Sequence, residues 1–108
     1  MTSPAPLAAL LILLAIGWPA AATAQSGSDE KCARYTRAWE ESVARLGVAG
    51  LSPEFVGAHA AFIASGCRSD VRHACPRGPA EIAMADRMTL LALNAGISGT
   101  FLPFLCRP

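Results

Sequence analysis

The chain has 108 residues, of which 53% are hydrophobic and 16% are charged, and its formal net charge at pH 7 is +1. This length allows one small domain at most. Basic residues barely outnumber acidic ones and are scattered along the chain, which excludes the basic surface typical of nucleic-acid-binding proteins.

The N-terminus has the pattern of a secretory signal peptide. Residues 7–17 form an apolar run that is too short to span a bilayer, and small residues follow it up to Ala24. The residues before this run contain no Lys or Arg, which departs from the usual basic start of such signals. We expect cleavage after Ala24, so that residues 1–24 are removed and residues 25–108 form one domain. This domain would be secreted or periplasmic.

Two helices are predicted in the first half of that domain. In residues 29–46, apolar side chains recur at steps of three and four, which places them on one face of an α-helix. Glycines in residues 47–50 end this helix, and Ser52 followed by Pro53 starts the next one, which ends at Gly66. The apolar faces consist of Cys32, Tyr35, Trp39, Val43 and Leu46 in the first helix and of Phe55, Val56, His59, Phe62 and Ile63 in the second.

A third helix is predicted from Pro79 or Ala80 to Asn94 or Ala95, with Gly96 as its stop. Its apolar stripe is wide, so we expect it to be the central helix. Residues 97–106 should fold back over the core as a short turn or helix. No useful stretch alternates like a β-strand. The predicted fold is all-α, a small three-helix bundle with a packed C-terminal tail. The stripe includes Ile82, Met84, Ala85, Met88, Leu91 and Ala92.

The four cysteines all follow the predicted signal peptide, so two disulfides are expected in an oxidising compartment. Cys32 and Cys67 are equally far from the turn at residues 47–50, so an antiparallel pair of helices would bring them together. The leading pairing is therefore Cys32–Cys67 with Cys75–Cys106. Two other pairings stay open, namely Cys67–Cys75 with Cys32–Cys106, and Cys32–Cys75 with Cys67–Cys106.

The motifs of several enzyme classes are missing from the sequence. There is no Cys-x-x-Cys redox motif and no Gly-x-Ser-x-Gly nucleophile motif. The acidic residues are expected on exposed faces or at helix starts, without a cleft between paired carboxylates. We therefore expect no enzymatic activity and no cofactor. These acids are Glu40, Glu41, Glu54, Asp70, Glu81 and Asp86.

The positive indication of a function is the apolar tail, which has more apolar surface than a short terminal segment usually needs. Its side chains either cover the third helix or form a patch for a partner. The sequence thus favours a protein- or ligand-binding module whose partner is another exported or envelope protein. The patch would consist of Phe101, Leu102, Phe104 and Leu105.

Three alternatives concern other residues. Copper or zinc handling would use soft and borderline ligands from His73, Cys75, Met84 and Met88. A membrane-associated protein would insert residues 89–105, although this segment is interrupted by polar residues, glycines and a proline. A pH sensor would use His59, for which the simpler expectation is a neutral imidazole bonded to a carbonyl in the core.

Overall fold

The computed structural model describes residues 20–107, with side chains from residue 27 onward. This part of the chain is helical and contains no strand, which confirms the predicted all-α class. Its elements are helix α1 (Ala20–Leu46), helix α2 (Pro53–Ala64), the short 3₁₀ turn η2 (Ser69–Val71), helix α3 (Pro79–Asn94) and the 3₁₀ turn η3 (Gly99–Phe101).

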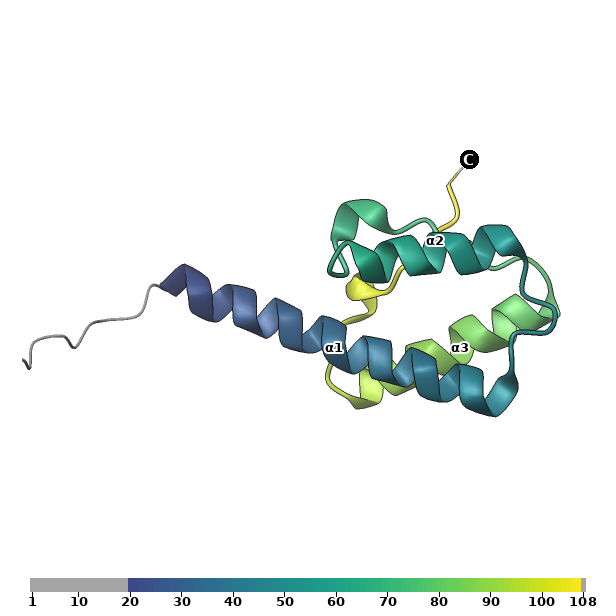
Figure 1. The fold of residues 1–108 in the computed structure, drawn as a ribbon, viewed down its shortest axis with the longest axis horizontal. Coiled ribbons are helices and arrows are strands. Elements are labelled where there is room, and N and C mark those ends of the chain that lie inside the picture. The colour runs from purple at the N-terminus through teal and green to yellow at the C-terminus, as the bar shows by residue number, and fades with distance from the viewer. Residues whose placement is uncertain (1–19, 108) are drawn as a thin grey trace, which may run out of the picture.

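The helices form a small bundle in which the tail is an integral layer. Helices α1 and α3 run side by side in opposite directions, and α2 lies across from this pair (Figure 1). The tail from η3 onward passes between α2 and the pair, and Leu102 and Pro103 are buried there. Within residues 20–107, no helix is long and apolar enough to cross a membrane.

Helix α1 begins nine residues earlier than the sequence indicates, at Ala20 rather than Asp29. Ser26 and Ser28 could have capped a helix, but they lie inside one, because extending an existing helix through small residues costs little. The expected cleavage site at residues 22–24 falls in the first turns of α1, and the apolar run at residues 7–17 lies outside the described residues.

Helices α2 and α3 begin and end close to where the sequence predicts. Ser52 is the N-cap of α2, where its hydroxyl accepts the backbone N–H of Phe55 at 3.1 Å. Gly66 and Gly96 follow the ends of α2 and α3 with φ angles of 84° and 80°. This left-handed conformation suits glycine because it has no Cβ atom.

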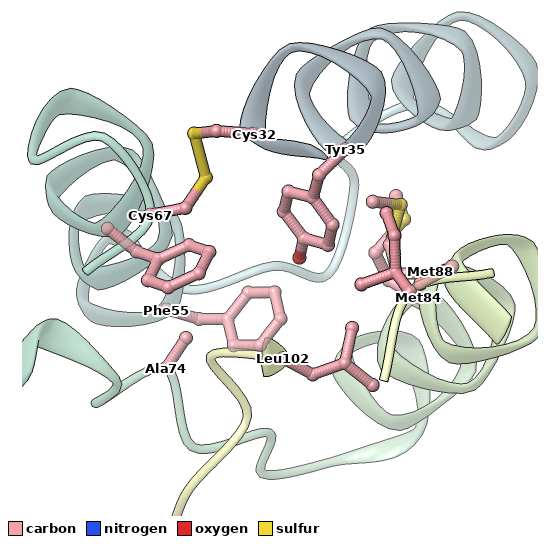
Figure 2. Packing of buried hydrophobic residues seen from close by; sticks show 11 residues of the cluster. Cys32, Tyr35, Phe55, Cys67, Ala74, Met84, Met88 and Leu102 are labelled. Atoms are coloured by element: carbon pink, nitrogen blue, oxygen red, sulfur yellow. A yellow bond between two sulfur atoms is a disulfide. The ribbon is translucent and has the colours of Figure 1, made fainter. Parts of the chain in front are cut away.

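The core joins aromatic side chains of α1 and α2 to the tail and to the methionines of α3. Tyr35, Phe55 and Leu102 meet near its centre, beside Met84 and Met88 (Figure 2). Burying each of these large side chains contributes about 1.5–3 kcal/mol to the hydrophobic driving force for folding.

The two disulfides follow the leading pairing. The Cys32–Cys67 bond ties α1 to the residue after Gly66, with 5.6 Å between the Cα atoms. The Cys75–Cys106 bond joins the segment before α3 to the end of the tail, with 4.6 Å between the Cα atoms. Two such bonds are compatible with an oxidising environment outside the cytoplasm.

Helix α3 is not buried on all sides, which corrects the expectation of a central helix. Met84 and Met88 face the core, whereas Ile82, Leu90 and Leu93 are about half-exposed or more. The tail rather than α3 occupies the space below α2 (Figure 1). The wide apolar stripe of α3 therefore extends beyond the surface that its neighbours cover, and Ile82 does not belong to the core.

Candidate functional site

A groove of about 450 Å³ lies where the first turns of α2 and α3 meet the segment that precedes α3. Both helices begin at the same end of the molecule (Figure 1). The volume falls in the range of sites that bind small ligands or short segments, which is roughly 300–1,000 Å³. Its lining residues are Ser52, Glu54, Phe55, His73, Cys75, Arg77 and Glu81.

The carboxylate of Glu81 holds two walls of the groove together. Its Oε2 atom accepts the backbone N–H of Ser52 at 2.7 Å, and its Oε1 atom accepts the backbone N–H of Arg77 at 2.8 Å. These two hydrogen bonds lower the pKa of the Glu81 carboxyl, and the bond from Ser52 has the larger effect. Together they outweigh the burial of the side chain, which acts to raise the pKa. At neutral pH the group is therefore an anion that fixes the start of α2 against the start of α3.

Glu81 is only 2% exposed, which the sequence did not reveal. It does lie at a helix start as expected, at the third position of α3. A Glu at this position often reaches back to the N-cap backbone N–H. Here it reaches one residue further, to Arg77, and across to Ser52, which is distant in sequence.

Two glycines allow the groove walls to approach one another. A Cβ atom on Gly50 would lie 2.7 Å from the Cβ of Ala80, so the turn after α1 packs tightly against the first turn of α3. Gly78 precedes α3 with a φ of 109°, a conformation that other residues rarely adopt. These backbone features bring Ser52 within reach of Glu81.

The groove combines an apolar wall with a rim of mixed charge. The half-buried Cys75 contributes apolar surface, whereas Phe55 borders the groove but is only 2% exposed and packs against Phe104, with 6.1 Å between the ring centres. Glu54, His73 and Arg77 are exposed at the rim. Such a surface can make apolar contacts with a ligand and can pair with ligand charges of either sign.

The tail residues expected to form a binding patch lie mainly against the core. Leu102 is buried, and Phe101, Phe104 and Leu105 are half-buried. Phe101 packs edge-on against Phe62 with 5.7 Å between ring centres, and Phe104 stacks near Phe55. Much of the apolar surface of the tail is thus used within the chain. The tail is connected to the groove lining through Phe104, which stacks near Phe55, and through the Cys75–Cys106 bond.

The four residues considered as metal ligands serve other roles. Cys75 is bonded to Cys106, and His73 is exposed at the groove rim. Met84 and Met88 are buried in the core, where the Ser42 hydroxyl donates to the Met88 sulfur at 3.4 Å. Across residues 27–107, no cluster of three or more His, Cys, Asp or Glu side chains is arranged to hold a metal ion.

His59 is fully buried outside the groove, and its partner differs from the expected carbonyl. Its Nε2 atom lies 2.7 Å from the hydroxyl of Tyr35, whereas its Nδ1 atom has no hydrogen-bond partner. Trp39 stacks on the imidazole with 3.8 Å between ring centres. Burial lowers the pKa of His59 to about 4 and raises that of Tyr35, so both side chains are neutral at pH 7.

A comparison with known protein families, curated proteins and solved structures gives no match for this chain. The sequence identifies Glu54 and Glu81 only as acids and gives no indication of a role for Arg77. The useful signal was the position of Glu81 three residues after the N-cap Gly78, which is typical of a side chain that bonds backbone amides.

Proposed function

We propose that this chain is an exported, non-enzymatic binding protein whose groove takes a short segment of another exported or envelope protein. The observation that carries the proposal is the buried carboxylate of Glu81, with its two backbone partners at 2.7 and 2.8 Å. Burying a charge is costly unless hydrogen bonds compensate it. An arrangement of this kind gives the groove a fixed shape, which lowers the entropy lost on binding.

The lining of the groove favours a polypeptide segment as the ligand. The Cys75–Cys106 bond, which lies beside the buried Phe55, offers apolar contacts, and Glu54 and Arg77 offer charges of opposite sign at the rim. A segment with an apolar side chain between charged neighbours would match both features. Charge pairs at such a rim add specificity and speed of association more than affinity.

Export is supported by the apolar run at residues 7–17, which is typical of signal peptides, and by the two disulfides. A structural rather than catalytic role for Glu81 is supported by its state. This carboxylate is ionised and committed to two backbone amides, so it is not free to act as a general acid or base.

Site-specific photo-crosslinking in exporting cells tests the proposal. A photoreactive amino acid replaces the exposed rim residue His73 in one variant and the exposed Leu90 in a matched control. Leu90 is nine positions after Glu81, which places it on the opposite side of α3. We expect a discrete protein adduct from position 73 that is lost when Arg77→Glu is added, and none from position 90. Equal adducts from both positions, or an adduct from position 90 alone, would contradict binding in the groove.

A further inference from the structure

The two disulfides differ in their access to solvent. Cys32 and Cys67 are 8% and 9% exposed, and their bond lies beside Tyr35 in the core (Figure 2). By contrast, Cys106 is exposed and Cys75 is half-buried in the lining of the groove. Thiol–disulfide exchange requires a thiolate to reach one sulfur of the bond, so access selects which bond reacts. The Cys75–Cys106 bond is thus the one open to attack.

The tail has attachments that do not depend on this bond. Leu102 and Pro103 are buried, the backbone N–H of Ala74 donates to the Pro103 carbonyl at 3.0 Å, and the Nε atom of Arg72 donates to the Leu102 carbonyl at 2.6 Å. These contacts all precede Cys106 in the chain. Opening the disulfide should therefore release the chain end after Phe104 while the rest of the tail stays in the core.

We propose that Cys75–Cys106 is a site of thiol–disulfide exchange with a dithiol oxidoreductase, and that opening this bond alters the groove. One thiolate of the oxidoreductase attacks the sulfur of Cys106, the more exposed of the two residues, and the sulfur of Cys75 leaves as a thiolate. The second thiol of the oxidoreductase then attacks the mixed disulfide and releases Cys106. The oxidoreductase ends as a disulfide. It has transferred two electrons and two protons to the bond, so Cys75 and Cys106 end as free thiols.

The exchange would act on binding because Cys75 is part of the apolar wall of the groove. After reduction, the sulfur of Cys75 is no longer held against the chain end, and that wall loses a fixed element. This effect on binding rests on the proposed function, whereas selective reduction of the bond does not.

Limited reduction tests the exchange directly. The oxidised protein is treated with dithiothreitol at neutral pH, and in parallel with reduced thioredoxin as a dithiol of protein size. Free thiols are alkylated and located by peptide mapping. We expect full labelling of Cys75 and Cys106 with none at Cys32 and Cys67, and an unchanged helical circular dichroism spectrum. Simultaneous labelling of all four cysteines, loss of helicity, or no labelling with thioredoxin would overturn the proposal.

A pair of variants separates the exchange from its effect on binding. The double variant Cys75→Ser/Cys106→Ser mimics the opened bond, and Cys32→Ser/Cys67→Ser is its matched control. We expect the first to keep cooperative unfolding and to lose the crosslink from position 73. An undiminished crosslink would refute the effect on the groove. No crosslink even in the oxidised wild-type background would instead refute the proposed function, and the labelling result would still decide the exchange.

The alkylated product of limited reduction is a second sample with an open Cys75–Cys106 bond. It is used if the double variant fails to fold, because it forms from protein that is already native. Purified protein with the photoreactive residue at position 73 is reduced and alkylated, and its crosslinking in an envelope extract is compared with that of oxidised protein carried through the same alkylation step.

Discussion

Because the imidazole of His59 is buried, the unfolding free energy of this protein should decrease in mildly acidic solution. In the folded state the ring is enclosed by Tyr35 and Trp39 of α1 and by Phe104 of the tail, and its Nδ1 atom has no partner to share a proton with. Tyr35 is neutral and so offers no compensating charge. Protonation of His59 therefore requires either a buried cation or exposure of the ring to water.

The magnitude follows from the two pKa values. Burial lowers the pKa of His59 from 6.5 to about 4. Between these values the unfolded chain binds a proton that the folded chain does not, so the contribution of His59 to stability falls as the pH falls from about 6.5 to about 4 and levels off below. Near and below pH 4 the lowered pKa of Glu81 adds a further loss, because the unfolded chain protonates this carboxyl first. At 1.36 kcal/mol for each pKa unit, the loss from His59 is about 2 kcal/mol by pH 5 and about 3 kcal/mol by pH 4. A small domain has a total stability of only about 5–15 kcal/mol.

Urea unfolding at a series of pH values measures this dependence. Trp39 is the only tryptophan in residues 25–108 and stacks on His59, so its fluorescence reports the local environment. We expect the unfolding free energy to decrease between pH 6.5 and 4 in wild type and in the exposed-residue control His73→Gln. The slope between pH 6.5 and 5, where His59 alone contributes, should be largely absent in His59→Phe, although its stability at pH 7 is lower because Tyr35 loses its partner. An equal slope in His59→Phe, or a flat wild-type profile, would refute this reasoning.

Three further substitutions, two of them with a matched control, probe the groove and the tail. Glu81→Gln should lower the unfolding free energy by about 1–3 kcal/mol at pH 7, because an amide cannot accept both backbone N–H groups, and urea unfolding measures it. Leu102→Ala should lower the unfolding free energy by about 2–5 kcal/mol in the same assay, because Leu102 is buried. Leu90 is 63% exposed, so Leu90→Ala should lower the unfolding free energy by about 0.5 kcal/mol or less. Gly50→Ala should lower the melting temperature, because the φ angle of 87° is strained for alanine and the added Cβ would lie 2.7 Å from the Cβ of Ala80. Gly57→Ala in α2 should raise the melting temperature, because the new Cβ has open space and alanine favours the helix. Equal costs for the members of either matched pair would contradict the structural reasoning.

The local features of the fold could be read from the sequence because each depends on residues that are close in the chain. Ser52 followed by Pro53 sets the start of α2, and Gly66 and Gly96 set the ends of α2 and α3. In these cases, short-range geometry is sufficient. The pairing of Cys32 with Cys67 spans 35 residues but could still be predicted, because the two cysteines are equally far from one turn and an antiparallel helix pair aligns such positions.

The groove could not be predicted because its geometry depends on contacts between distant segments. Helical periodicity places Glu81 in the first turn of α3, but it does not show that the side chain reaches Ser52, 29 residues away. Periodicity likewise predicts an apolar face for α3 without showing which neighbour covers it. The tail fills the space under α2, so Ile82 stays exposed and Leu102 becomes buried.

Binding of a partner in the groove is tested most directly by the ratio of crosslinked product from position 73 to that from position 90 in exporting cells. We expect a discrete adduct at position 73 alone, and its loss in Arg77→Glu, which changes one exposed rim charge. An adduct at position 90 that equals or exceeds the one at position 73 would place binding on the opposite side of α3. A position-73 adduct that Arg77→Glu leaves intact would likewise contradict recognition by the groove rim.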